Sequence, residues 1–292
     1  MKPVDFDYVR PHSLAAALAA LAGANGEAKV IAGGQSLGPL LNMRLVRPAL
    51  LVDVNALPGF DAIEEREQWV RVGATVRQRD AERSELVARR LPLLRDALPF
   101  VGHAHTRNRG TVVGSVVHAD PTAEIPLVAV CLDAVVEIAG PRGAREAPVA
   151  DFYQGYLATD LAADELVVGV RFGAHPPAAG AVRVTGFAEM ARREGDFAIV
   201  AAAVQLDVER ESRRVREARL GLAGVGGAPV RLRASEAALC AGRDGASAFA
   251  DAVAAAGPAI DPDGDLHATA AYRRTIAGPL LARALRLAWA RL

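Results

Sequence analysis

The sequence predicts an α+β fold in two domains, on three observations. The chain has 292 residues, half of them apolar, which suits about two domains with sizeable cores. Around 174–180, the run His175-Pro176-Pro177 lies among alanines and glycines and indicates a domain boundary. Beyond it, three β-rich runs precede three helical patterns, an order typical of an α+β domain. We therefore expect domains at 1–175 and 180–292.

An alanine-rich helix is expected near the start of the chain, over 14–22. Ser13 is a good N-cap, alanine is the best helix former, and Gly23 is a good stop. The same stretch could mimic a signal-peptide core after Arg10, but acidic residues lie where a leader would be positive, so an ordinary helix is favoured. No apolar stretch is long enough to span a bilayer.

Alternation and capping signals place the other elements of the first domain. Apolar and other residues alternate over 69–76, as in a half-buried strand. Asp120 and Pro121 predict a helix with Asp120 as its N-cap, running to Leu132. Further strands are expected at 29–31, 50–54, 134–139 and 165–172, and helical patterns at 78–98, broken by Pro92, and at 151–156.

In the second domain, charged turns separate the β-rich runs, which suggests an antiparallel meander. The runs cover 182–190, 197–208 and 215–223. Helical patterns follow at 231–240, 246–256 and 269–292.

Charge and residue usage exclude several classes of protein. The formal net charge is zero, which argues against a nucleic-acid or anionic-membrane surface. Lysine occurs only at Lys2 and Lys29, so the Gly-Lys pair of a Walker loop is absent. Cys131 and Cys240 are too few for a ferredoxin-type iron–sulfur centre. We expect two free thiols in a reducing compartment, and hence a cytoplasmic location.

Two glycine-bearing segments are the most informative feature of the chain. The first is Ala32-Gly33-Gly34-Gln35-Ser36-Leu37, and the second is Thr111-Val112-Val113-Gly114-Ser115. Each segment is expected to be a short loop, and a loop with bare N–H groups and small hydroxyls can approach a phosphate closely, because glycine tolerates positive φ. A β-branched residue such as Val113 resists positive φ, so Gly114 is expected to supply the flexibility of the second segment. Together they predict that one diphosphate is bound from both sides.

Other interpretations of these motifs are weaker. Gly33-Gly34 alone is more often a tight turn than a ligand loop. A Rossmann site is not supported, because Pro229 occupies the third glycine position after Gly224-Val225-Gly226. Glu124 could accept hydrogen bonds from sugar hydroxyls, or could simply be a favourable first-turn charge.

Three histidines, His103, His105 and His118, lie close in sequence. Their spacing is loose and no thiolate or carboxylate set surrounds them, so we expect no metal site.

The two segments resemble the FAD loops of the flavoprotein (medium) subunit of molybdenum hydroxylases. That family includes the carbon monoxide dehydrogenase medium subunit and the FAD domain of xanthine dehydrogenase. The matching stretches are 32–37 with Asn42-Met43-Arg44-Leu45, 107–115 with His118-Ala119-Asp120-Pro121, Arg192-Arg193-Glu194-Gly195-Asp196-Phe197, and Tyr272-Arg273-Arg274. The family usually has two glycines before the residue matching Ser115, and here Val113 replaces one.

The resemblance implies a two-subdomain, PCMH-like FAD-binding domain, with subdomains at about 1–57 and 58–175, and a C-terminal α+β domain with an antiparallel sheet and helices. It places Glu124 near the sugar hydroxyls of FAD and Phe197 beside the isoalloxazine. The FAD-binding residues so implied are Ala32, Gly33, Gly34, Gln35, Ser36, Leu37, Thr111, Val112, Val113, Gly114, Ser115, Asp120, Glu124 and Phe197.

The resemblance also implies an oxidoreductase subunit with no catalytic acid or base of its own. A small [2Fe-2S] subunit and a large molybdopterin subunit would be its partners, in a heterotrimer or a dimer of heterotrimers. FAD would receive electrons from the clusters and pass them to NAD, a quinone or oxygen. Two alternatives stay open: a free-standing FAD-dependent oxidase or reductase, and a non-catalytic nucleotide-binding scaffold.

Overall fold

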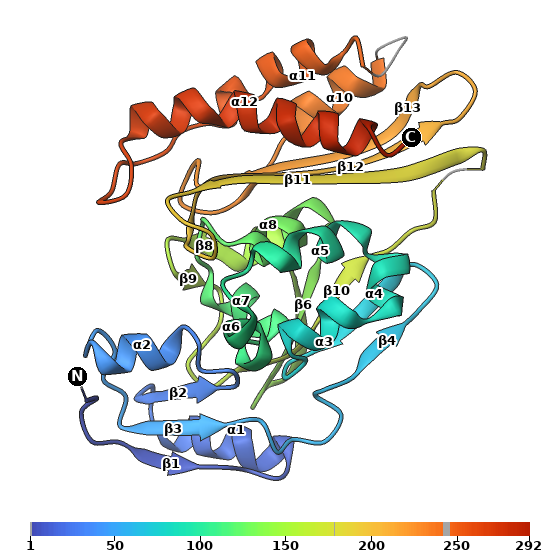
Figure 1. Cartoon of the computed structure of the whole chain (residues 1–292). Helices are drawn as coiled ribbons and strands as arrows, with labels where there is room; N and C mark the ends of the chain where they lie inside the picture. The colour runs from blue at the N-terminus through green and yellow to red at the C-terminus, as the bar shows by residue number, and fades with distance from the viewer. Residues whose placement is uncertain (1, 178, 242–245) are drawn as a thin grey trace.

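The structure is a computed structural model that describes residues 2–177, 179–241 and 246–292. Figure 1 shows three units stacked along the molecule, from the small N-terminal unit through a central unit to the C-terminal unit at the opposite end. The chain passes from the central to the C-terminal unit between Gly173 and Ala181.

The N-terminal unit is a parallel three-stranded sheet in the order β1-β3-β2. Its helix α1 confirms the predicted helix, because the Ser13 side chain accepts a hydrogen bond from the Ala16 N–H at 3.2 Å. The elements are β1 (Asp7–Val9), α1 (Leu14–Gly23), β2 (Ala28–Ile31), α2 (Leu37–Asn42) and β3 (Leu50–Asp53).

The central unit is a five-stranded antiparallel sheet in the order β4-β5-β10-β6-β7, covered by short helices. Its strands are β4 (Ile63–Glu65), β5 (Trp69–Gly73), β6 (Val135–Gly140), β7 (Gly143–Pro148) and β10 (Leu166–Gly173), beside a small hairpin of β8 (Tyr153–Gly155) and β9 (Ala158–Thr159). Its helices are α3 (Gln78–Arg83), α4 (Glu85–Arg90), α5 (Pro92–Ala97), α6 (Ala104–Arg109), α7 (Val112–His118), α8 (Glu124–Cys131) and α9 (Val149–Phe152).

Two helix predictions in this unit need correction. The helix predicted from Pro121 begins only at Glu124, because Asp120 Oδ1 accepts hydrogen bonds from the Thr122 N–H at 2.8 Å and the Thr122 hydroxyl at 2.7 Å. Those bonds form a local turn that competes with the helix, so Asp120 is not the N-cap. The helical turn predicted at 151–156 is likewise displaced, since the helix ends at Phe152 and Tyr153 starts a strand.

The C-terminal unit is the predicted antiparallel meander, in the order β11-β12-β13-β14. Its elements are β11 (Ala181–Ala191), β12 (Ala198–Glu209), β13 (Val215–Ala223), β14 (Val230–Arg231), α10 (Arg233–Ala241), α11 (Phe249–Ala255) and α12 (Ala270–Trp289). Helix α12 lies along one face of the sheet, while α5 and α8 of the central unit lie against the other (Figure 1). Both faces of the sheet are therefore covered.

Candidate functional site

The first glycine segment begins where β2 ends, at the carboxyl edge of the parallel sheet. Ligands of parallel α/β sheets bind at this edge. Gly34 has a φ of 69°, a value that glycine adopts readily, and the segment is half-buried. Within the described chain, the backbone N–H groups from Gly34 to Leu37 donate to no protein acceptor. They are thus available to an anion.

The first glycine segment packs against the residues that lead directly into the second. A Cβ on Gly33 would clash with the Arg109 carbonyl oxygen and lie 2.7 Å from Gly110 Cα, directly before Thr111. Backbone therefore packs on backbone here, and only glycine fits. This contact joins the N-terminal unit to the central unit at the point where both segments lie.

The second segment is the start of a helix rather than a loop. Thr111 is the N-cap of α7, and its hydroxyl accepts a hydrogen bond from the Gly114 N–H at 2.9 Å. The expectation that Gly114 supplies flexibility is wrong, because Gly114 has no positive φ. Gly114 instead leaves room for the cap, since a Cβ there would lie 2.5 Å from Thr111 Oγ1.

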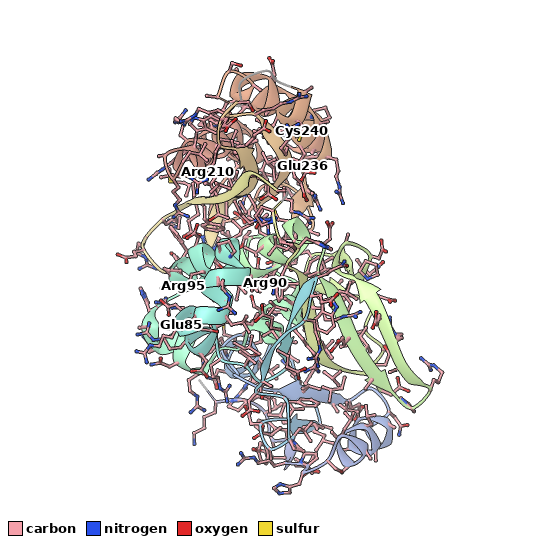
Figure 2. The ribbon with its side chains drawn as sticks, turned by 90° about the vertical axis from the view of Figure 1, so that its right-hand side faces the viewer. Glu85, Arg90, Arg95, Arg210, Glu236 and Cys240 are labelled. Atoms are coloured by element: carbon pink, nitrogen blue, oxygen red, sulfur yellow. The ribbon has the colours of Figure 1, made fainter. Side chains whose placement is uncertain are left out.

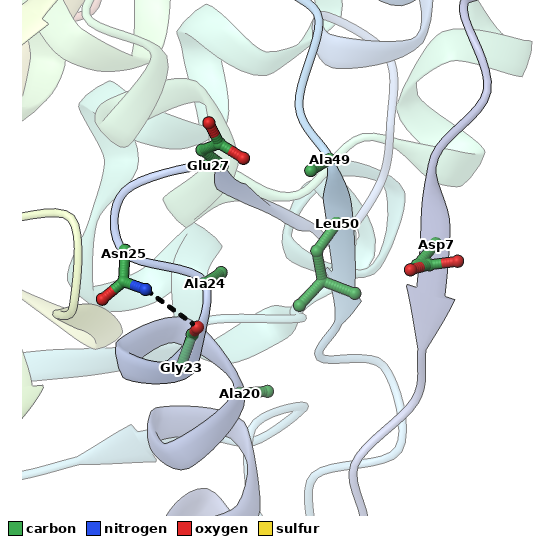
Figure 3. A pocket seen from close by; sticks show the side chains of 8 residues that line it. All are labelled: Asp7, Ala20, Gly23, Ala24, Asn25, Glu27, Ala49 and Leu50. Atoms are coloured by element: carbon green, nitrogen blue, oxygen red, sulfur yellow. Dashed lines mark hydrogen bonds between the residues drawn. The ribbon is translucent and has the colours of Figure 1, made fainter.

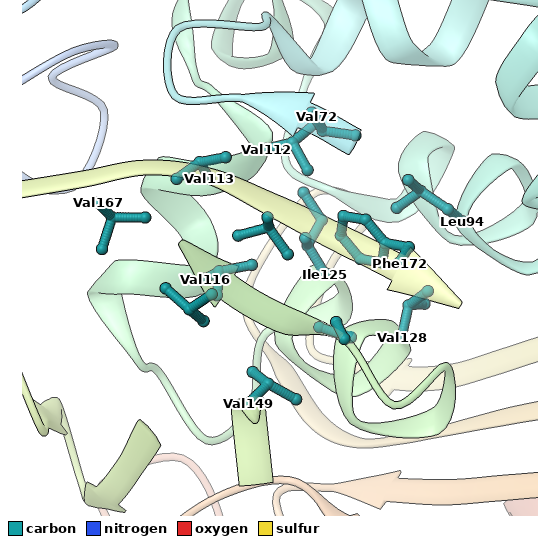
Figure 4. Close-up of a cluster of buried hydrophobic side chains, with 14 of the residues drawn as sticks. Val72, Leu94, Val112, Val113, Val116, Ile125, Val128, Val149, Val167 and Phe172 are labelled. Atoms are coloured by element: carbon teal, nitrogen blue, oxygen red, sulfur yellow. The ribbon is translucent and has the colours of Figure 1, made fainter. Parts of the chain in front are cut away.

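Two of the predicted site residues point away from any ligand. Val112 and Val113 are buried, and Figure 4 shows them in the hydrophobic cluster with Val72 and Phe172. Val113 keeps ordinary backbone angles, as expected. Both valine side chains fill the core, so only the backbone of these residues could face a cofactor.

The polar side chains of the first segment differ in whether they are hydrogen-bonded within the protein. Gln35 folds back, and its Nε2 donates to the Gly33 carbonyl at 3.1 Å. Ser36 forms no capping hydrogen bond, and Leu37 opens α2. The donors that this segment offers to a ligand are therefore its backbone N–H groups and the Ser36 hydroxyl.

Asn55 and Arg77 link the two segments and were missed in the sequence. Asn55 Nδ2 donates to the Ala32 carbonyl at 2.8 Å, and Arg77 donates to Asn55 Oδ1 at 2.6 Å and to the Arg109 carbonyl at 2.7 Å. Asn55 follows β3 at the same carboxyl edge as the first segment, which was a usable signal. Nothing in the sequence pattern singles out Arg77.

Glu124 is a buried carboxyl group in the first turn of α8. Burial, with a smaller contribution from the Asp120 carboxylate, raises its pKa to about 7. Glu189 on β11 lies near it, and burial together with the Glu124 charge raises the pKa of Glu189 to about 8. Glu189 Oε2 has no hydrogen-bond partner among the described residues. Two acids thus lie close enough to interact in one poorly solvated region.

Phe197 lies in the turn between β11 and β12. The residue directly precedes β12 and is 66% exposed. The turn is seated on His103, because a Cβ on Gly195 would lie 2.5 Å from His103 Cε1, and His103 precedes α6 and the second segment. Phe197 is therefore free to contact a ligand ring.

A surface hollow elsewhere does not compete with this site. Figure 3 shows it between the end of α1 and the amino ends of β1 and β3, with Asp7 and Glu27 among its lining residues. It lies at the sheet edge opposite the glycine segment, and its two carboxylates would repel a phosphate.

The described residues contain no group of three or more His, Cys, Asp or Glu side chains that could hold a metal ion. None of the helices in the described ranges is both long and apolar enough to cross a membrane.

The fold and the site define a class: a protein of parallel and antiparallel α/β units whose backbone N–H groups at residues 34–37 are free of protein acceptors in the described chain and can receive an anion. The family model described as the FAD binding domain in molybdopterin dehydrogenase matches residues 4–174. The model of the CO dehydrogenase flavoprotein C-terminal domain matches residues 185–288. The chain belongs to the family of FAD-binding subunits of molybdenum hydroxylases, and FAD is its cofactor.

Relatives align over nearly their whole length. The 6-hydroxypseudooxynicotine dehydrogenase complex subunit alpha of Paenarthrobacter nicotinovorans is 37% identical, over 98% of this chain and 96% of the relative. The caffeine dehydrogenase subunit beta of Pseudomonas sp. (strain CBB1) is 35% identical, over 98% and 95%. A structure of carbon monoxide dehydrogenase from Hydrogenophaga pseudoflava, which lacks the Mo-pyranopterin moiety of its cofactor, matches with a TM-score of 0.93 and 34% identity, over 100% of this chain and 99% of that one. Both curated relatives are named as subunits, and this chain likewise works with partner subunits.

Proposed function

We propose that this chain is the electron-transfer subunit of a molybdenum hydroxylase complex. It would receive electrons from the clusters of a small [2Fe-2S] subunit and pass them to an external acceptor. A large molybdopterin subunit would oxidise the substrate, in a heterotrimer or a dimer of heterotrimers. The observation that carries the proposal is the backbone contact between Gly33 and Arg109–Gly110, which brings the two FAD segments together.

The residues present fit FAD. The backbone N–H groups of 34–37 would hold the diphosphate, and neither glycine segment carries an acidic side chain that would repel it. Phe197 would cover the ring, and Glu124 would face the sugar hydroxyls. When bound, FAD supplies the exchange between one-electron and two-electron transfer. The chain binds and orients it and needs no acid or base of its own for substrate oxidation.

The substrate is set outside this chain. The relatives are named for 6-hydroxypseudooxynicotine, caffeine and carbon monoxide, which share little chemistry, yet their flavin subunits align along their length. We also retain the cytoplasmic location as a proposal, supported by the two free cysteines.

The test is purification of the full chain, alone and with candidate small and large subunits from neighbouring genes. We expect the chain alone to show the absorbance bands of oxidised flavin and to release FAD, without turnover of the complex's substrate. With its partners, substrate should reduce the flavin. A colourless chain would contradict FAD binding, and steady turnover by the chain alone would favour the free-standing oxidase.

A further inference from the structure

We propose that Arg77 is a positioning residue that, through Asn55, fixes the spacing between the two glycine segments and thereby sets the affinity for the diphosphate of FAD. This inference rests on the proposed function. Neither residue belongs to the glycine segments themselves.

Arg77 bridges the segments with the two arms of one guanidinium. Nη1 donates to the Arg109 carbonyl at 2.7 Å, and Nη2 donates to Asn55 Oδ1 at 2.6 Å. Asn55 Nδ2 completes the link by donating to the Ala32 carbonyl at 2.8 Å. A planar fork of donors holds two acceptors at a fixed separation, which a single ammonium cannot do. Ala32 and Arg109 are therefore tied together by three short hydrogen bonds.

Asn55 is itself held in the orientation that this link needs. Its N–H and its Nδ2 donate to Asp53 Oδ1 at 2.8 and 2.6 Å. The Tyr8 hydroxyl donates to Asp53 Oδ2, and the Arg10 Nε lies 3.7 Å from the same oxygen. With both amide donors facing acceptors, the Asn55 carbonyl oxygen is the atom left to receive Arg77.

The second segment and Gly110 before it are hydrogen-bonded to the backbone on both sides of Arg77. Arg77 pairs with Thr111 in an isolated antiparallel bridge, and the Gln78 N–H donates to the Gly110 carbonyl at 2.9 Å. The Val112 N–H donates to the Val76 carbonyl at 3.1 Å. A shift of Arg77 would therefore move the second segment with it.

The Arg109 carbonyl gives Arg77 a second effect on an anion. This oxygen lies against Gly33, where the first segment passes. A free carbonyl dipole there would repel a diphosphate, and the Arg77 guanidinium engages it. No carboxylate in the described part of the chain forms an ion pair with Arg77, so its charge is not neutralised by a contact partner.

The test compares four full-length, FAD-free chains: wild type, Arg77→Met, Arg77→Lys and Arg90→Met. Arg90, labelled in the central unit in Figure 2, is a matched control, because it donates to the Glu67 and Ala174 carbonyls at 2.9 Å each but contacts neither segment. FAD and ADP are the probes, with dissociation constants from flavin fluorescence and from competition. Thermal unfolding of each chain without ligand reports stability.

We expect Arg77→Met to weaken the binding of FAD and of ADP by the same factor, about tenfold or more, because two hydrogen bonds from a charged donor are lost. Arg77→Lys should fail to restore either affinity, and Arg90→Met should stay within about twofold of wild type for both. Wild-type affinity in Arg77→Lys would mean that charge alone acts, and would overturn the proposal. A weaker affinity for FAD with an unchanged affinity for ADP would also overturn the proposal. If Arg77→Met does not fold, the affinities of Arg77→Lys and Asn55→Ser are measured instead. Both variants should bind FAD and ADP more weakly than wild type, and wild-type affinity in both would overturn the proposal. A wild-type chain that binds neither probe would instead contradict the proposed function.

Discussion

At the residue scale, the site depends on one glycine more than on the others. Gly33 touches the backbone of Arg109 and Gly110, directly before the second segment, whereas Gly34 is required for its φ of 69° and Gly38 has open space around its missing side chain. The three positions look alike in the sequence. Only the structure shows which one limits the approach of the two segments.

We therefore expect Gly33→Ala to weaken FAD binding strongly. The new methyl group would lie 2.7 Å from Gly110 Cα and force the segments apart. Overpacking of this kind costs about 1–3 kcal/mol, which corresponds to roughly fivefold to 150-fold in the dissociation constant. Gly38→Ala is the control and should bind normally, measured by titration of the FAD-free chain. Equal affinity of both variants would show that the contact does not shape the site.

The buried acids predict how stability depends on pH. The pKa of Glu124 is raised by burial from 4.5 to about 7, so the folded state retains a proton that the unfolded state releases. Its contribution is fully favourable below pH 4.5, is lost as the pH rises to about 7, and is constant above that.

Glu124→Gln should remove this dependence. One pKa unit corresponds to about 1.4 kcal/mol, so the variant should gain up to about 3 kcal/mol over wild type between pH 4.5 and 7. Urea unfolding of the FAD-free chains at several pH values measures this. A difference that does not change with pH would mean that Glu124 is solvated in the folded chain.

At the scale of the element, strong patterns gave accurate predictions. The strand at 215–223 is found at Val215–Ala223, because its apolar residues pack in the sheet as its pattern indicates. The strand β7 was missed, because Gly143–Pro148 contains no β-branched or aromatic residue. It is an edge strand that pairs with β6 alone. Tertiary pairing, which the local sequence does not encode, decides such segments.

The glycine segments show the same limit at the site. The segments were expected to bind one diphosphate from both sides, and the structure packs Gly33 against Arg109 and Gly110, directly before the second segment. The start of α7 was expected to be a loop, because its glycine and hydroxyl residues suggested one. The capping of α7 by Thr111 was not recognised. Asn55 and Arg77 lie 22 residues apart and act together only once the units are assembled.

This capping gives a prediction for α7. Thr111→Val keeps the shape of the side chain but removes the acceptor for the Gly114 N–H. We expect a loss of about 1 kcal/mol in the free energy of unfolding, measured with urea on the FAD-free chain. Thr111→Ser retains the hydroxyl and should lose less. Equal losses in both variants would indicate that the methyl packing of Thr111, and not the cap, stabilises the helix.

At the scale of the whole molecule, α8 joins two units into one body. Every residue of Glu124–Cys131 is buried, and a helix apolar all round must be covered on all sides. The sequence carried this signal, but the partner on the far side, the C-terminal sheet, could not be predicted. That sheet supplies Ala198, Ala201, Ala203 and Ala223 to the core of the central unit. Small residues let the sheet approach the helix closely.

Strand β13 approaches α8 closely at Gly221, and the reactivity of the two cysteines can report on this contact. A Cβ there would lie 2.6 Å from Cys131 Sγ and 2.8 Å from Leu127 Cδ1. Cys131 is fully buried, which raises its pKa to about 12, whereas Cys240 is half-buried. Since the thiolate is the reactive form, iodoacetamide should label Cys240 and spare Cys131 in the native chain.

Gly221→Val should separate β13 from α8 and make Cys131 reactive, as read by mass spectrometry of peptides. Gly257→Val, which meets open space, is the control and should leave Cys131 protected. Rapid labelling of Cys131 in the wild-type chain would mean that the C-terminal sheet separates from α8 in solution, and the two units would then be independent.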